Sequence, residues 1–162
     1  MARQHVEVIT TDAIAAELKH LHAEISQRAY ELFRTHERLW IGALDDWLRA
    51  ERELVWRPAV ELRQRDTEFE LVAALAGVEP TDLDIQVTSR DILIKAKGEH
   101  QHRPDTSAMH LCEFTRGKLF RSIHLPDAID PHGVTVEYRN GLLRLTARIA
   151  KAEPPRIHVQ AA

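Results

Sequence analysis

Residues 117–126 read Gly-Lys-Leu-Phe-Arg-Ser-Ile-His-Leu-Pro, and this stretch decides the fold. Every second position from Leu119 to Leu125 falls in one register, which holds three aliphatic side chains and Arg121. Such an alternation over a short run is typical of a β-strand, because successive side chains point to opposite faces of a sheet. The stretch therefore predicts a strand with one face toward a hydrophobic core.

The same two-residue period recurs on both sides of this stretch. The alternating runs are Phe69 to Leu75, Leu83 to Val87, Ile92 to Ala96, Val134 to Tyr138 and Leu143 to Ile149. Between the last two runs, Asn140-Gly141 is a strong hairpin signal, because a type I′ turn needs positive φ at both central positions. Several short alternating strands separated by turn residues predict an all-β, immunoglobulin-like antiparallel sandwich with one solvated face per sheet.

The chain before Trp56-Arg57-Pro58 has a helical period instead. Its first apolar series recurs at steps of three and four residues and consists of Ile14, Leu18, Leu21, Ile25, Ala29 and Leu32. This spacing places the series on one face of a helix. A second amphipathic run extends from Leu44 to Leu54, and we expect Pro58 to end it. We therefore divide the chain into a helical N-terminal region (residues 1–56), a β-sandwich domain (57–151) and a polar, flexible tail (152–162).

Composition argues against several classes of function. The chain has 162 residues and a formal net charge of −3, so no strong field is available to hold a nucleic acid. No stretch approaches the roughly 18 uncharged apolar residues that a membrane span needs. The single Cys112 favours a reducing, cytoplasmic location. The sequence has no Gly-rich phosphate loop, nucleophile elbow or paired-carboxylate motif, so we expect neither an enzyme nor a cofactor.

Four motifs, in order, resemble the α-crystallin domain of the small heat-shock proteins, over residues 58–151 and the tail. Residues 75–77, Leu-Ala-Gly, are similar to the family's Leu-Pro-Gly turn, and residues 117–126 to its Gly-x-Phe-x-Arg-x-Phe-x-Leu-Pro strand. Residues 140–143, Asn-Gly-Leu-Leu, match its Asn-Gly-Val-Leu signature. Residues 157–159, Ile-His-Val, match its C-terminal Ile-x-Ile/Val anchor.

The resemblance implies an ATP-independent holding chaperone that binds partly unfolded client proteins and works as a dynamic homo-oligomer built from dimers. In the family, the tail anchor of one subunit enters a groove between two strands of one sheet edge in another subunit. Here the anchor is Ile157 and Val159, which project to the same side of an extended chain. The groove residues that the resemblance implies are Leu83, Ile85, Val87, Val134, Val136 and Tyr138. Because each buried aliphatic side chain contributes only about 1.5–3 kcal/mol, a single anchor is exchangeable and only many together make a lasting assembly.

A second implied contact follows the polar connection from Gly98 to Met109, which is too long for a tight hairpin. In bacterial and plant members of the family, this region bears a strand that the two subunits of a dimer exchange. The resemblance implies a swapped dimer here, with a contact formed by Met109, His110, Leu111, Cys112, Glu113 and Arg121. Arg121 is then buried at the dimer contact; the alternative is an exposed strand arginine.

The histidines and the helices leave alternatives open. His100, His102, His110 and Cys112 lie close in sequence, but no paired ligand spacing frames them, so we expect solvated histidines rather than a metal site. Residues 24–54 resemble a short bacterial helical module of unknown function, which implies no activity. The tryptophans either bind clients or pack the helices, and packing is favoured.

Two positions depart from the family's pattern. Val136 stands where Ala is usual, and Ala150 where a Pro usually closes the domain. Neither departure changes the predicted fold. The alternative function is an adaptor or co-chaperone-type interaction module without holding activity, although such relatives generally lack the tail anchor and the Asn-Gly hairpin signature.

Overall fold

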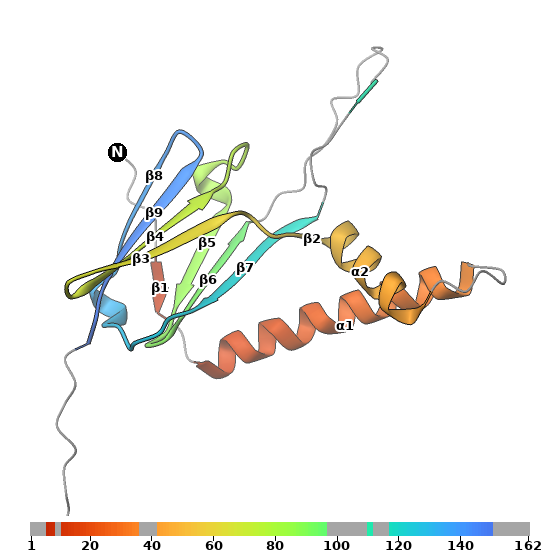
Figure 1. The fold of residues 1–162 in the computed structure, drawn as a ribbon, viewed down its shortest axis with the longest axis horizontal. Coiled ribbons are helices and arrows are strands. Elements are labelled where there is room, and N and C mark those ends of the chain that lie inside the picture. Colours follow the sequence, from red (N-terminus) through yellow and green to blue (C-terminus); the bar gives the residue numbers. More distant parts are fainter. Residues whose placement is uncertain (1–5, 9–10, 36–41, 97–109, 112–116, 151–162) are drawn as a thin grey trace, which may run out of the picture.

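The computed structural model describes residues 6–8, 11–35, 42–96, 110–111 and 117–150. A two-layered β-sandwich makes up most of these residues, and a hairpin of two helices lies beside it (Figure 1). The predicted class, an antiparallel sandwich preceded by a helical region, is confirmed.

Two helices form the hairpin. α1 spans Thr11–Thr35 and α2 spans Ala43–Leu54. α2 turns back along α1 (Figure 1), and Arg28 of α1 pairs with Glu53 near the end of α2, with 2.8 Å between Nη2 and Oε2. The rings of His22 and Trp47 also pack together, with 4.7 Å between their centroids. Trp47 therefore has a packing role between the helices.

The described strands form two sheets. The five-stranded sheet has the order β1-β5-β6-β7-β2 and consists of Val6–Val8, Leu83–Val87, Asp91–Ala96, Lys118–His124 and Val55–Trp56. The four-stranded sheet has the order β3-β4-β9-β8 and consists of Val60–Arg65, Glu68–Ala74, Leu142–Arg148 and Thr135–Arg139. Two short 3₁₀ helices, η1 (Pro80–Asp82) and η2 (Pro131–Gly133), lie between strands. Pairing is antiparallel except that β1 runs parallel to β5, and β2 parallel to β7.

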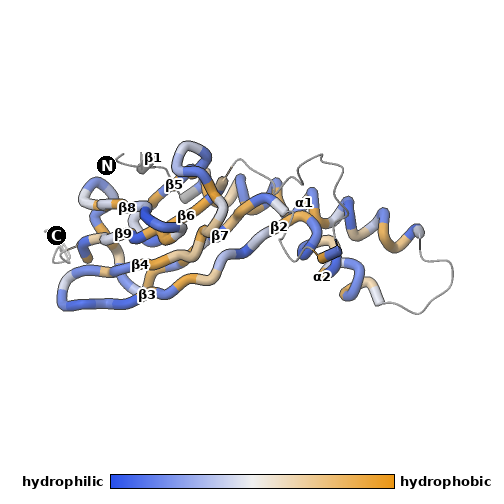
Figure 2. The backbone as a smooth tube through the Cα atoms, turned by 90° about the horizontal axis from the view of Figure 1, so that it is seen from above, coloured by the Kyte–Doolittle hydropathy of each residue, from blue (hydrophilic) through white to orange (hydrophobic). Residues whose placement is uncertain are grey.

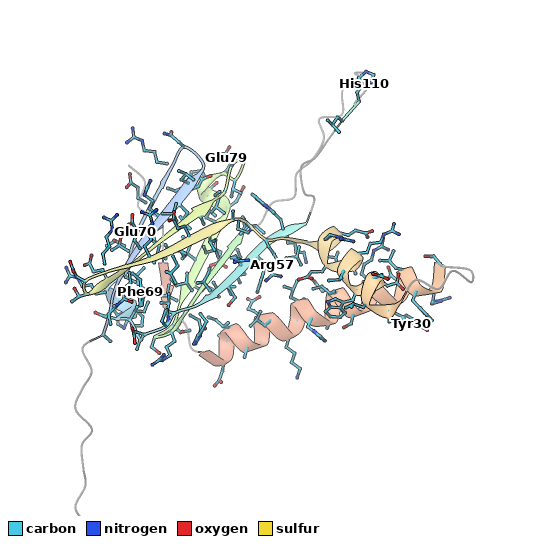
Figure 3. All side chains as sticks on the ribbon, viewed as in Figure 1. Tyr30, Arg57, Phe69, Glu70, Glu79 and His110 are labelled. Carbon is cyan, nitrogen blue, oxygen red and sulfur yellow. The ribbon has the colours of Figure 1, made fainter. Side chains whose placement is uncertain are left out.

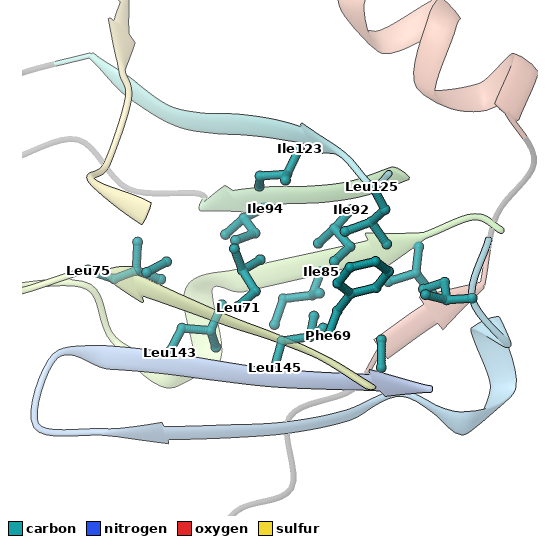
Figure 4. Packing of buried hydrophobic residues seen from close by; sticks show 14 of the residues in the cluster. Phe69, Leu71, Leu75, Ile85, Ile92, Ile94, Ile123, Leu125, Leu143 and Leu145 are labelled. Carbon is teal, nitrogen blue, oxygen red and sulfur yellow. The ribbon is translucent and has the colours of Figure 1, made fainter. Parts of the chain in front are cut away.

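The main hydrophobic core lies between the two sheets. In β4, the buried residues Phe69, Leu71 and Ala73 alternate with half-buried ones, which is the predicted register. Figure 4 shows the side chains of β4 and β9 meeting those of the other sheet. The large side chains of this core with the least exposure are Phe69, Leu71, Leu75, Ile85, Ile92, Ile94, Leu119, Leu125, Ile129, Leu143 and Leu145.

The Asn-Gly hairpin has the predicted geometry. Asn140 and Gly141 have φ values of 52° and 75°, the positive values that a type I′ turn requires. A Cβ at Gly141 would lie 3.1 Å from the Cα of Ala76, and the N–H of Leu75 donates to the carbonyl of Gly141 at 2.7 Å. The motifs at residues 75–77 and 140–143 are therefore in direct contact, and together they close one end of the sandwich.

Three strands were not predicted from the sequence. β3 has polar residues on both faces over its second half, and the tip of the β3–β4 hairpin is hydrophilic (Figure 2). β1 and β2 are only three and two residues long. α2 ends at Leu54, the last residue of the predicted amphipathic run, and it ends before Pro58 because Val55 already pairs with Lys118 of β7.

A second hydrophobic cluster joins the helices to the sandwich. Its buried members Ile25, Leu32, Ala50 and Val55 pack with Phe120 of β7. Phe120 lies between Leu119 and Arg121 in sequence, and successive side chains of a strand point to opposite faces. One face of β7 therefore packs in the main core and the other packs against the helices. Two ion pairs support the attachment: Lys95 Nζ lies 2.7 Å from Glu17 Oε1, and Lys118 Nζ lies 3.1 Å from Glu24 Oε1.

Candidate interaction sites

The six predicted groove residues come from β5, from β8 and from Val134, which immediately precedes β8. β5 belongs to the five-stranded sheet, whereas β8 is the outer strand of the four-stranded sheet. The expectation that both strands belong to one sheet edge is wrong, because β5 pairs with β1 and β6 while β8 pairs with β9. A groove formed by these residues would run between the two layers of the sandwich.

The groove residues differ in how deeply they are buried. Ile85 and Val87 are 1% and 0% exposed and belong to the main core. The half-buried members, which pack against that core, are Leu83, Val134, Val136 and Tyr138. The half-buried members still have apolar surface that a further chain segment could cover, and covering it would be favourable.

Tyr138 is held in place at this site by its hydroxyl group. The hydroxyl donates toward the carbonyls of Leu75 and Val78, at 2.8 and 2.7 Å. Burial, and to a smaller extent the charge of Glu79, raises the pKa of the Tyr138 phenol. The phenol thus stays neutral and fixes β8 to the turn that follows β4.

The edge of β5 is occupied by the N-terminal strand. Val6, Glu7 and Val8 pair with Ile85, Gln86 and Val87. The backbone of β5 therefore has neighbours on both sides, β1 and β6. The sequence interpretation missed this contact, although the Val-x-Val spacing of residues 6–8 was a signal for it.

Of the predicted dimer contact, the structure describes His110, Leu111 and Arg121. His110 lies far from the body of the sandwich (Figure 3), and Leu111 is 77% exposed. Met109, Cys112 and Glu113 lie outside the described residues. An aliphatic side chain as exposed as Leu111 has much apolar surface left to bury against another chain.

Arg121 occupies a position in β7 that otherwise carries core residues. It falls in the register of Leu119 and Ile123, opposite Ile94 of β6, and its side chain is half-buried. Within the described part of the chain, its buried Nε has no hydrogen-bond partner. A buried guanidinium N–H without an acceptor is costly.

The helical hairpin exposes large apolar side chains, and four of them, all but Leu18 near the start of α1, are here named the hairpin patch. Its members are Tyr30 (62% exposed), Phe33 (58%), Leu44 (69%) and Leu48 (41%). Tyr30 and Phe33 lie three residues apart in α1, and Leu44 and Leu48 four apart in α2, so each pair shares one face of its helix. Tyr30 is well separated from the sandwich core around Phe69 (Figure 3).

Other predicted features lie partly beyond the described residues. The tail anchor Ile157 and Val159 and the loop residues His100 and His102 are all outside them. The described residues include no cluster of His, Cys, Asp or Glu that could hold a metal ion. Neither described helix is both long and apolar enough to cross a membrane.

The sandwich, its Asn-Gly hairpin and the inward arginine of β7 define an α-crystallin type of domain. The model of the Hsp20/alpha crystallin family matches residues 61–161. The chain therefore belongs to the Hsp20/alpha crystallin family, and the resemblance to that family found in the sequence is confirmed; the resemblance of residues 24–54 to a helical module stays a prediction.

Known relatives agree with this assignment. The chain is 28% identical to spore protein SP21 of Stigmatella aurantiaca, over 63% of this chain and 61% of that protein. It is 27% identical to small heat shock protein C2 of Rickettsia felis, over 55% and 58% of the two chains. These matches span about three fifths of each relative's length. A solved small heat-shock protein from Xylella fastidiosa superposes with a TM-score of 0.51 at 28% identity, over 65% of this chain and 98% of that one.

Proposed function

We propose that the protein is an ATP-independent holding chaperone, which binds partly unfolded proteins and keeps them from aggregating. The observation that carries the proposal is the hairpin patch, displayed beside an Hsp20/alpha crystallin sandwich. Apolar surface is what an unfolded chain exposes, so such a patch binds it without regard to sequence. Small heat shock proteins among the relatives support a chaperone role.

The free energy of client binding to the hairpin patch is small enough for reversible binding. Full burial of a large apolar side chain contributes about 1.5–3 kcal/mol, and the four patch residues are already partly covered. Binding also has to overcome the loss of translational freedom and the ordering of the client. One patch therefore holds a client weakly, and several patches on one oligomer hold it firmly through multivalency. This mode of binding needs no nucleotide.

The proposal includes assembly into dimers and larger homo-oligomers. Ile157 and Val159 of one subunit would cover the half-buried residues along β5 and β8 of another. β3 is the other outer strand of the four-stranded sheet, and an outer strand has backbone groups free to pair. The segment from Met109 to Glu113 would be exchanged between the subunits of a dimer, and Arg121 would find its acceptor there. A cytoplasmic location is part of the same proposal.

The holding function is tested by light scattering from an aggregating model client, without ATP. Leu44→Ser with Leu48→Ser removes half of the hairpin patch from exposed positions, so the fold should persist. The double variant should suppress aggregation several-fold less than the unmodified protein. Leu142→Ser is the matched control, because Leu142 is an exposed leucine of β9 outside the patch. Equal suppression by all three proteins would exclude the patch as the client-binding surface.

The adaptor alternative is tested by size. Light scattering at micromolar concentration should show an oligomer if the chain is a holding chaperone of this family. Ile157→Ala with Val159→Ala should shrink the oligomer while the β-sheet circular dichroism is unchanged. A monomeric unmodified protein would favour the adaptor, and a double variant of undiminished size would exclude the tail as the anchor.

A further inference from the structure

The N-terminal strand β1 pairs with the edge of β5, and in the proposed function the tail anchor of another subunit binds along β5. β1 pairs in parallel with β5 over three residue pairs, from Val6 opposite Ile85 to Val8 opposite Val87. Without β1, β5 would be an outer strand of its sheet, with β6 as its only described neighbour. The edge of a strand can form a ladder with only one neighbour at a time.

The two segments that could occupy this edge have the same short pattern. Residues 6–8 read Val-Glu-Val, and residues 157–159 read Ile-His-Val. Each has two β-branched aliphatic residues separated by one polar residue, the pattern that places both aliphatic residues on the same side of a strand. Recognition by strand addition combines backbone pairing with pockets for alternate side chains, so it would accept either segment.

We propose that the β5 edge is one binding site with two alternative occupants, the chain's own Val6–Val8 strand and the tail anchor of a second copy. The inference rests on the proposed function, because it takes the tail as an anchor. When Val6–Val8 is paired, the edge is closed to the tail of another subunit. Release of this strand opens the edge and favours assembly.

The structure explains why the internal occupant competes well although it is short. Only residues 9 and 10 separate β1 from α1, which begins at Thr11. The first half of α1 is fixed to the sheet, since Ile14 is buried and Glu17 pairs with Lys95 of β6. Val6–Val8 is therefore tethered close to β5 at a high effective concentration. A ladder of three residue pairs is nevertheless small enough to open without unfolding of the sandwich.

The test measures the affinity of a labelled peptide with the sequence of residues 151–162 for the full chain. The chain carries Ile157→Ala with Val159→Ala, so that its own anchor does not interfere. A second version also carries Glu7→Pro with Val8→Pro. Successive N–H groups of a strand point to opposite sides, so two consecutive prolines remove a donor facing β5 in either register. Arg3→Pro with Gln4→Pro, outside β1, is the control.

Fluorescence anisotropy should show tighter peptide binding when β1 is disrupted. If β1 closes the edge in about nine molecules of ten, the apparent affinity rises about tenfold, and the control stays at the starting value. Equal affinity for all versions would overturn the competition while the anchor stands. Absence of binding to every version would refute the anchor itself, and the competition with it.

Discussion

Gly117 is the residue at which the sandwich meets the helical hairpin, and its replacement tests whether the two are joined as described. A Cβ at this position would lie 2.5 Å from the carbonyl carbon of Leu54 and 2.5 Å from the nitrogen of Val55. These are backbone atoms at the junction of α2 and β2, so they cannot rotate away as a side chain can. Gly117→Ala must therefore push β2 and the end of α2 away from β7.

The expected cost follows from what this displacement disturbs. It separates Val55 from Lys118 and Trp56 from Leu119, and it loosens Phe120 from the second cluster. Overpacking of this kind costs about 1–3 kcal/mol. Alanine offsets about 0.4–1 kcal/mol of this cost, because it lowers the conformational entropy of the unfolded chain relative to glycine. We expect Gly117→Ala to lower the free energy of unfolding by about 1–2 kcal/mol.

Urea unfolding followed by tryptophan fluorescence measures this change, because Trp47 lies in α2 and Trp56 in β2. Gly133→Ala is the matched control. Its Cβ would lie 3.2 Å from Oδ2 of Asp130, a carboxylate that can shift, and its nearest contacts are confined to that side chain. All proteins are compared at one concentration, since assembly changes apparent stability. If Gly117→Ala and Gly133→Ala unfold at the same urea concentration, the close contact between β7 and the hairpin does not exist in solution.

Two further substitutions test individual contacts. Tyr138→Phe removes the hydroxyl that donates toward the carbonyls of Leu75 and Val78, and should lower the unfolding free energy by about 1–2 kcal/mol. The control is Tyr30→Phe, at an exposed position, which should leave the melting temperature unchanged. Equal melting temperatures for Tyr138→Phe and the unmodified protein would contradict the role of the hydroxyl. Glu17→Gln tests the pH dependence of Lys95. Burial lowers the pKa of Lys95, but the hydrogen bond that Lys95 donates to Glu17 and the charge of Asp84 outweigh it, so the pKa lies above its ordinary value. A raised lysine pKa contributes stability that is present at neutral pH and lost as the pH rises through the pKa of the folded state. Because Glu17 is partly exposed, the substitution should cost only up to about 1 kcal/mol at pH 7. As the pH is raised from 7 to about 11, the urea concentration at the midpoint of unfolding should then fall less for Glu17→Gln than for the unmodified protein. An identical fall in the two proteins would contradict the pairing of Glu17 with Lys95.

The strands that the sequence predicted are those whose apolar residues recur at every second position, and the pattern is clearest in two of them. β4 and β9 face the core with every second residue, so their pattern is visible locally. The Asn140-Gly141 turn was predictable because few residues tolerate positive φ at two consecutive positions. β3 was missed since an outer strand with polar residues on both faces has no hydrophobic period. β1 and β2 were missed because they are only three and two residues long, and the Val-x-Val spacing of residues 6–8 does not by itself say which strand it pairs with.

The interaction sites proposed from the sequence stay predictions. They are the anchor at residues 157–159 and the residues of β5 and β8 that such an anchor could cover. The assignment of β5 and β8 to different sheets depends on the order of the strands, which the sequence does not state. The hairpin patch could not be predicted from the sequence either. Leu44 and Trp47 belong to one amphipathic run, and only the packing of α2 on α1 leaves Leu44 exposed while it partly covers Trp47.

The central claim is that the chain holds non-native proteins in solution without nucleotide. Size-exclusion chromatography with light scattering tests it directly, after the protein and a heat-labile client have been heated together in the absence of ATP. We predict that client and protein elute together as one large soluble complex. Client recovered in the pellet, with the protein eluting at its original size over a range of temperatures and ratios, would contradict the claim.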